Sequence, residues 1–165
     1  MTIAIVSAMH EELAAVLALM PDERRQIAGG REFWRGHLHG HEVVAVLSRI
    51  GKVAAATTAT ALIERLRVRE IVFTGVAGGL GPGVNVGHVV VADHFLQHDM
   101  DASPIFPKYE VPLYGQSRFA ADAALTQRLA DAAAQALPGV PVHRARWLAG
   151  RLRRGRLVSP VPVRV

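Results

Sequence analysis

The sequence predicts an α/β protein with helices on both faces of a largely parallel or mixed sheet, in three layers. Two observations carry this prediction. Short apolar, β-branched runs alternate with longer segments of helical period along most of the chain. The 165 residues are enough for one domain with a sizeable core, and no internal repeat or interdomain linker divides them.

The first predicted strand, residues 2–6, leads into a helix. Ser7 can cap that helix, and Glu11 and Glu12 fall in its first turn, where carboxylates favour the positive end of the helix dipole. Pro21 marks the end of the helical segment. Apolar residues recur at helical spacing between these signals: Leu13, Val16, Leu17 and Met20.

A hairpin, a second helix and a third core strand follow. The Gly29-Gly30 pair and the segment 32–42 predict a hairpin that leads into a core strand at 43–47. Residues 51–66 are rich in Ala and Thr, a composition that permits close packing of a helix against a sheet. Residues 71–74 form the third predicted core strand.

A glycine-rich segment opens the second half of the chain. Residues 75–83 do not spell GxGxxG, and a strand at 88–93 follows rather than a helix, so a dinucleotide site is excluded. The segment instead predicts a strand end whose backbone can approach a ligand closely. Residues 120–137 predict an amphipathic helix that Pro138-Gly139 ends, and residues 140–142 begin another strand.

The basic charge of the chain lies in its last part. Seven of the 19 Lys and Arg residues are arginines within 143–165, which leaves 12 basic against 14 acidic residues in 1–142. We therefore predict a domain at 1–142 and an Arg/Pro-rich tail of doubtful origin at 143–165. The tail could be an arm for nucleic acid or an anionic surface, but the abrupt change of composition favours out-of-frame or degenerate sequence.

Composition excludes several classes of protein. The chain has no cysteine, so a disulfide framework and a thiolate metal site are both excluded. The N-terminal apolar run stops at His10-Glu11-Glu12 and lacks a basic region before it, which is typical of neither a signal peptide nor a membrane span. We expect a cytoplasmic protein without membrane attachment.

Two groups of histidines are candidates for metal ligands. His37, His39 and His41 would share one face if they lay on a single strand, but no carboxylate completes the set. The cluster at 98–101 (His98-Asp99-Met100-Asp101) is better explained as a loop held by Asp side-chain hydrogen bonds. No metal site is predicted.

Several segments together resemble the 5′-methylthioadenosine/S-adenosylhomocysteine nucleosidases. These segments are IAIVSAMHEEL at 3–13, SRIGKVAA at 48–55, TGVAGGL at 74–80, VGHVVVAD at 86–93 and HDMD at 98–101. Their order and spacing agree with the family almost without gaps from residue 1 to about 101, and more loosely to about 142.

The resemblance implies a nucleoside phosphorylase-like fold, here lacking its C-terminal part, and a homodimer without cofactor. It implies hydrolysis of the N-glycosidic bond of methylthioadenosine and S-adenosylhomocysteine with release of adenine, a reaction of methionine salvage. By this analogy Glu12 activates the attacking water and Phe106 reaches the neighbouring subunit's alkylthio pocket. The remaining implied pocket residues are Ile50, Val76, Ala77, Gly78 and Gly79.

The family's late Met-Glu and Ser-Asp motifs, which imply the ribose-binding and acid groups, have no counterpart in this sequence. No Met follows Met100 and no Asp follows Asp131. Val76 also stands where the family often has Ser, and Arg49 where it has Gly. We therefore expect a truncated or frameshifted nucleosidase with weak or no activity.

Two alternatives remain open: a non-catalytic nucleoside- or partner-binding protein, and a nucleoside phosphorylase with Arg49 as its anion group. Nucleic acid is not an expected partner.

Overall fold

The computed structural model describes residues 1–149, 157–158 and 162–164. The expected tail at 143–165 therefore lies partly outside the described residues. Two compact units are present: residues 1–76 with 161–165, and residues 77–160.

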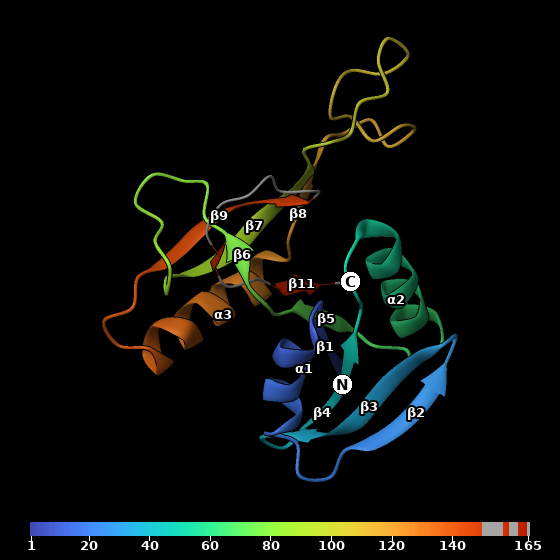
Figure 1. Cartoon of the computed structure of the whole chain (residues 1–165), viewed down its shortest axis with the longest axis vertical. Coiled ribbons are helices and arrows are strands. Elements are labelled where there is room, and N and C mark those ends of the chain that lie inside the picture. Colours follow the sequence, from blue (N-terminus) through green and yellow to red (C-terminus); the bar gives the residue numbers. More distant parts are fainter. Residues whose placement is uncertain (150–156, 159–161, 165) are drawn as a thin grey trace. The chain divides into compact units, whose positions relative to one another are not determined.

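The described part of the first unit is a six-stranded mixed sheet together with α1 and α2. Figure 1 shows its arrangement. The strand order is β11-β5-β1-β4-β3-β2. In this order β4 and β5 both run parallel to β1, whereas β2, β3 and β11 pair antiparallel. The elements are β1 (Ile3–Ser7), α1 (His10–Leu17), β2 (Arg24–Ala28), β3 (Arg31–Leu38), β4 (His41–Leu47), α2 (Lys52–Glu64), β5 (Glu70–Phe73) and β11 (Pro162–Arg164).

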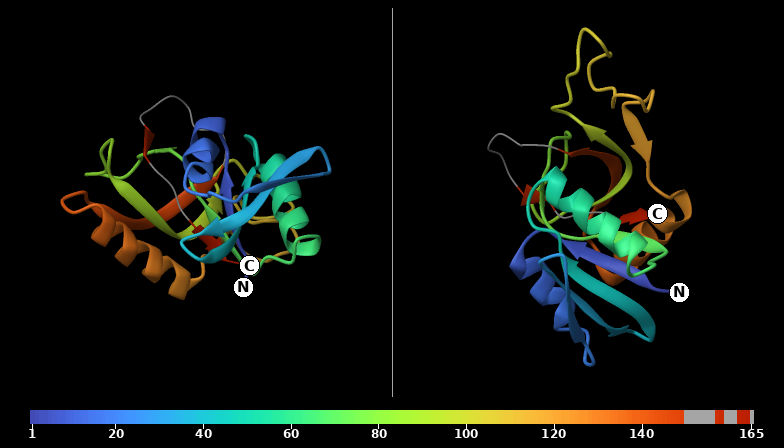
Figure 2. Two further views of the ribbon diagram at one scale, coloured as in Figure 1. Left: turned by 90° about the horizontal axis from the view of Figure 1, so that it is seen from below. Right: turned by 90° about the vertical axis from the view of Figure 1, so that its right-hand side faces the viewer.

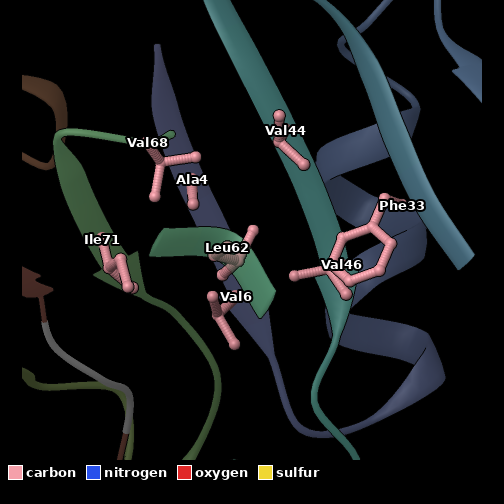
Figure 3. Packing of buried hydrophobic residues seen from close by; sticks show 8 residues of the cluster. All are labelled: Ala4, Val6, Phe33, Val44, Val46, Leu62, Val68 and Ile71. Carbon is pink, nitrogen blue, oxygen red and sulfur yellow. The ribbon is translucent and has the colours of Figure 1, made fainter. Parts of the chain in front are cut away.

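Residues of β1 and β4 alternate between two apolar clusters on opposite faces of this sheet. One cluster packs Ala4, Val6, Val44 and Val46 against Leu62 of α2, with Phe33, Val68 and Ile71 (Figure 3). The other cluster joins Ile5, Val43 and Ala45 to Leu13, Val16 and Leu17 of α1 and to Met20, which follows the helix. Because successive strand residues point to opposite faces, this alternation gives three layers. The predicted α/β class with a mixed sheet is confirmed.

The second unit is built on a long strand. Its elements are β6 (Ala77–Gly78), β7 (Val89–Gln97), β8 (Arg118–Ala120), α3 (Ala123–Ala136), β9 (Val142–Ala149) and β10 (Leu157–Val158). Strand β7 pairs parallel with β9 and antiparallel with β8, and α3 packs along β7 and β9 (Figure 2). Between β7 and β8 a long loop extends away from the three strands (Figures 1 and 2).

Strand β9 begins at Val142, the last residue of the predicted domain. Residues Val142–Ala149 form one strand, paired with β7 from Val89 to Gln97. The imidazoles of His88 and His143 are hydrogen-bonded across this pair, Nδ1 to Nε2, at 2.9 Å. Parallel pairing with β7 thus explains a strand that has no apolar period of its own.

Candidate active site

Glu12 is held at the N-terminus of α1, directly after β1. It is the third residue of the helix, and Met9 occupies the N-cap position. Its Oε2 atom accepts hydrogen bonds from the main-chain N–H groups of Ala8 and Met9, at 2.9 and 3.0 Å. The expectation that Ser7 caps the helix is wrong. Ser7 is the last residue of β1, fully buried, and its Oγ has no hydrogen-bond partner among the described residues.

The other carboxylate oxygen of Glu12 contacts the loop that follows β5. The main-chain N–H of Val76 donates to Oε1 at 2.8 Å. This contact is possible because β1 and β5 are parallel neighbours, so their carboxyl ends lie at one edge of the sheet. The hydrogen bond from the N–H of Thr74 to the carbonyl oxygen of Val6, at 2.8 Å, extends the pairing to that edge.

These surroundings offer the carboxylate several hydrogen-bond donors. Three main-chain N–H groups donate to its two oxygens, and the helix dipole places positive charge at the N-terminus of α1. A carboxylate fixed in this way at the carboxyl edge of a parallel sheet lies where open α/β folds bind ligands. It can accept a proton from a water molecule or hold a hydroxyl group.

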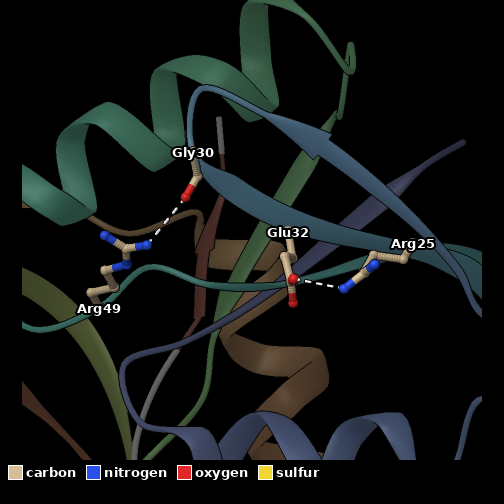
Figure 4. A network of polar contacts seen from close by, with 4 residues as sticks. All are labelled: Arg25, Gly30, Glu32 and Arg49. Atoms are coloured by element: carbon tan, nitrogen blue, oxygen red, sulfur yellow. Dashed lines mark hydrogen bonds and ion pairs between the residues drawn. The ribbon is translucent and has the colours of Figure 1, made fainter.

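The end of β4 completes the same edge of the sheet. The N–H of buried Ser48 donates to the Ser7 carbonyl oxygen at 2.8 Å, and the Ser48 hydroxyl also contacts that oxygen at 3.2 Å. The following Arg49 has a left-handed backbone, with φ +66°, and its guanidinium donates to the Gly30 carbonyl oxygen at 3.1 Å (Figure 4). Ile50 is 81% exposed.

A cavity of about 540 Å³ lies beside α1. Its lining includes apolar residues of α1 with Trp34 and Leu47, and the polar residues His10, Arg31, Glu32 and Arg49. Glu32 is paired with Arg25 at 2.9 Å on the adjacent strand (Figure 4). Because Glu12 is not among the lining residues, the cavity is separate from the carboxylate.

The structure brings Glu12 and Val76 together, and Val76 remains 42% exposed. The other predicted pocket residues lie in other parts of the chain. Ala77 and Gly78 form β6, which pairs antiparallel with β10 in the second unit. Gly79 and Phe106, in the same unit, are half-buried. Their roles as pocket residues stay predictions.

Sequence reasoning missed the main-chain partners of Glu12. The N–H groups of Ala8, Met9 and Val76 carry no side-chain signal, and the Val76 contact depends on β5 lying beside β1. A Glu three residues after a helix N-cap is the one sequence pattern that could have indicated the first two.

The three alternating histidines do not share one strand face. His37 lies in β3, His39 takes a left-handed turn conformation with φ +48°, and His41 begins β4. The carboxylate of Asp22 accepts from the His37 backbone and contacts its ring at 2.7 Å each. Within the described ranges, no three His, Asp or Glu side chains gather as a metal site.

The loop at 98–101 is held as expected by an aspartate. The Asp101 carboxylate accepts hydrogen bonds from the N–H of Ser103 at 3.2 Å and from its hydroxyl at 2.7 Å. These two bonds hold the pKa of Asp101 below its usual value.

Residues 2–153 match the model of the phosphorylase superfamily. This chain belongs to the phosphorylase superfamily. Among curated relatives, it is 39% identical over 136 residues to a 5′-methylthioadenosine/S-adenosylhomocysteine nucleosidase of Geobacillus thermodenitrificans, covering 82% of this chain and 57% of that one. The match thus spans less than two thirds of the relative's length.

Two solved enzyme structures show the same fold. The nucleosidase of Neisseria meningitidis in complex with methylthio-immucillin-A superposes with a TM-score of 0.85 and 32% identity, covering 92% of this chain and 65% of that one. A futalosine hydrolase of Helicobacter pylori superposes with a TM-score of 0.83 and 29% identity, covering 92% and 64%. The nucleoside phosphorylase-like fold is therefore confirmed.

Proposed function

We propose that this chain carries the water-activating half of a nucleosidase site for adenine nucleosides with a 5′-thio substituent, methylthioadenosine and S-adenosylhomocysteine. The observation that carries the proposal is the carboxylate of Glu12, fixed by three N–H donors at the carboxyl ends of β1 and β5. The nucleosidase relatives, and the methylthio-immucillin-A bound in the Neisseria enzyme, support the substrate class.

In the proposed reaction Glu12 accepts a proton from water while the water oxygen bonds to C1′ of the ribose. The bond between C1′ and N9 breaks, and its electron pair leaves with adenine, which takes up a proton from solvent. The transition state resembles an oxocarbenium ion, so the negative charge of Glu12 also favours it. Ile50, Val76, Ala77, Gly78 and Gly79 are proposed to line the nucleoside pocket.

Protonation of the departing adenine is expected to limit the rate of the proposed reaction. The sequence contains neither a Ser-Asp nor a Met-Glu pair, so the acid that the family resemblance implies has no counterpart in residues 1–165. A general acid typically contributes about 10²–10⁴-fold to a rate. We therefore expect release of adenine to be slower than in a full-length relative by about that factor.

We also propose that the chain forms a homodimer, because the loop between β7 and β8 carries exposed apolar residues. Ile105, Leu113 and Tyr114 of this loop are 82%, 93% and 69% exposed. Apolar side chains gathered in one exposed loop favour contact with another protein surface. In the dimer Phe106 would contact the partner's pocket, and light scattering after size-exclusion chromatography measures the assembly directly.

A cytoplasmic location is proposed as well. The chain has no cysteine. No helix in the described part of the chain is long and apolar enough to cross a bilayer.

The experiment that tests the function is adenine release from methylthioadenosine in phosphate-free buffer and in buffer with phosphate. Hydrolysis predicts release in both buffers, with methylthioribose as the second product. Release that requires phosphate and yields methylthioribose 1-phosphate would instead show a phosphorylase. S-Adenosylhomocysteine and a futalosine analogue, supplied in parallel, identify the preferred 5′ substituent. Tight binding of methylthioadenosine without any release would show a non-catalytic nucleoside-binding protein.

A further inference from the structure

Gly75 lies in the loop after β5, directly against the carboxylate of Glu12. A Cβ atom built on Gly75 would overlap Oε1 and Cδ of Glu12 and would lie 2.5 Å from Oε2. Real Cβ atoms essentially never approach another heavy atom within 3.0 Å. Any other residue at position 75 therefore has to displace either the carboxylate or the loop.

The need for glycine at this position is steric rather than conformational. Gly51 and Gly83 have left-handed backbones, with φ +111° and +77°, which side-chain-bearing residues rarely adopt. Gly75 is not among the glycines with positive φ. Its φ therefore does not itself require glycine, whereas the carboxylate of Glu12 lies where a side chain would begin.

We propose that Gly75 is a positioning residue for Glu12. The missing side chain leaves the space in which the carboxylate accepts the Val76 N–H while keeping the N–H groups of Ala8 and Met9. The catalytic consequence rests on the proposed function of Glu12. The packing relationship does not depend on it.

An alanine at position 75 pushes the carboxylate out of this space. Glu12 then loses its hydrogen bond to Val76, which is one link between α1 and the loop after β5. Replacing Glu12 by alanine removes the three atoms nearest to that Cβ, so we expect the methyl group that Gly75→Ala introduces to fit there. The two substitutions should therefore compensate each other.

A double-mutant cycle on the full 165-residue chain tests this coupling. The urea unfolding midpoint is measured for the parent, Gly75→Ala, Glu12→Ala and the double variant. Gly75→Ala should lower the midpoint by about 1 M in the parent, the size expected for one overpacked methyl group. In the Glu12→Ala background, Gly75→Ala should shift the urea unfolding midpoint by less than about 0.3 M.

Gly81→Ala is the matched control. A Cβ at position 81 would contact Val84 Cγ2 at 3.5 Å, an ordinary van der Waals distance, and the Gly81 backbone is not left-handed. This variant should keep the parent's midpoint.

If Gly75→Ala alone does not fold, folding of the double variant is the supporting result. An equal effect of Gly75→Ala in both backgrounds, or a double variant that also does not fold, overturns the proposal.

Adenine release from methylthioadenosine adds a catalytic readout. Gly75→Ala should lower kcat by about 10²-fold with KM little changed, because the base is misplaced while the pocket remains. Gly75→Ala combined with Glu12→Gln should be no slower than Glu12→Gln alone. Unchanged kcat in Gly75→Ala contradicts the positioning role. A parent chain that releases no adenine contradicts the proposed function instead, and the unfolding cycle then decides on Gly75.

Discussion

The carboxylate of Glu12 accepts a hydrogen bond from the main-chain N–H of Val76, 2.8 Å away and 64 residues later in the chain. With its bonds to Ala8 and Met9, it joins the start of α1 to the loop after β5. One side chain thus has both a structural role and the proposed chemical one. Substitutions of Glu12 should consequently affect stability as well as activity, and the two must be measured separately.

Ser7 and Ser48 form a matched pair for stability. Ser7 Oγ is buried without a partner in the described structure, whereas Ser48 Oγ contacts the carbonyl oxygens of Ser7 and Arg49, at 3.2 and 2.9 Å. Ser7→Ala should leave the free energy of unfolding unchanged or raise it by up to about 1 kcal/mol, because it removes an unpaired buried hydroxyl. Ser48→Ala should lower it by about 1 kcal/mol. Urea unfolding measures both, and the reverse ranking would contradict the hydrogen-bond assignment.

Arg31 connects β3 to α2 through three hydrogen bonds. Its guanidinium donates to the hydroxyls of Thr58 and Thr57 and to the carbonyl oxygen of Ala54. Thr58 is fully buried. Arg31→Met should therefore lower the free energy of unfolding by about 1–3 kcal/mol, as expected for loss of charge-assisted bonds to partly buried groups.

Arg25→Met is the control for Arg31→Met. Arg25 is paired with Glu32 at the surface, with the two side chains 53% and 49% exposed. Surface ion pairs contribute about 0–1 kcal/mol, so this variant should lose less stability. Equal losses in the two arginine variants, measured by urea unfolding, would show that the bonds of Arg31 to α2 are not important for stability.

The hydrogen bonds between Asp22 and His37 predict that the free energy of unfolding depends on pH. Hydrogen bonds from the side chain and the backbone of His37 lower the pKa of Asp22 in the folded chain. A carboxyl group with a depressed folded-state pKa contributes stability that is present above its unfolded pKa of about 4 and is lost as pH falls through the folded value. Asp22→Asn should thus be less stable than the parent at pH 7, with the difference shrinking below about pH 4. Urea unfolding at a series of pH values measures this, and a constant difference down to about pH 3 would contradict it.

The main strands and helices of the first unit could be predicted because burial on two faces leaves a period in the sequence. Residues 43–47 and 51–66 are predicted on this basis and are found as β4 and α2. Strand β2 has no such signal. Four of its five residues are exposed, and pairing with β3 alone defines it.

The candidate site was only partly predictable for a related reason. Glu12 is recognised from its local sequence. Its contact with Val76 depends on β5 lying beside β1 in the sheet, and the order of the strands along the sequence does not determine that they are neighbours. The Ser7 cap is wrong because Met9 rather than Ser7 sits at the N-cap position and the Glu12 carboxylate accepts the free N–H groups there. The three alternating histidines are separated by a turn at His39-Gly40, where both residues have positive φ.

The most direct test of the Glu12 assignment is the rate of adenine release from methylthioadenosine, without phosphate, by the parent chain and by Glu12→Gln. Glutamine keeps the size of the side chain, but its amide nitrogen cannot accept a proton or an N–H bond. We predict slow release by the parent and a rate at least about 10²-fold lower in the variant, with both proteins folded by circular dichroism. Equal rates in two folded proteins would contradict the assignment of Glu12 as the group that activates water.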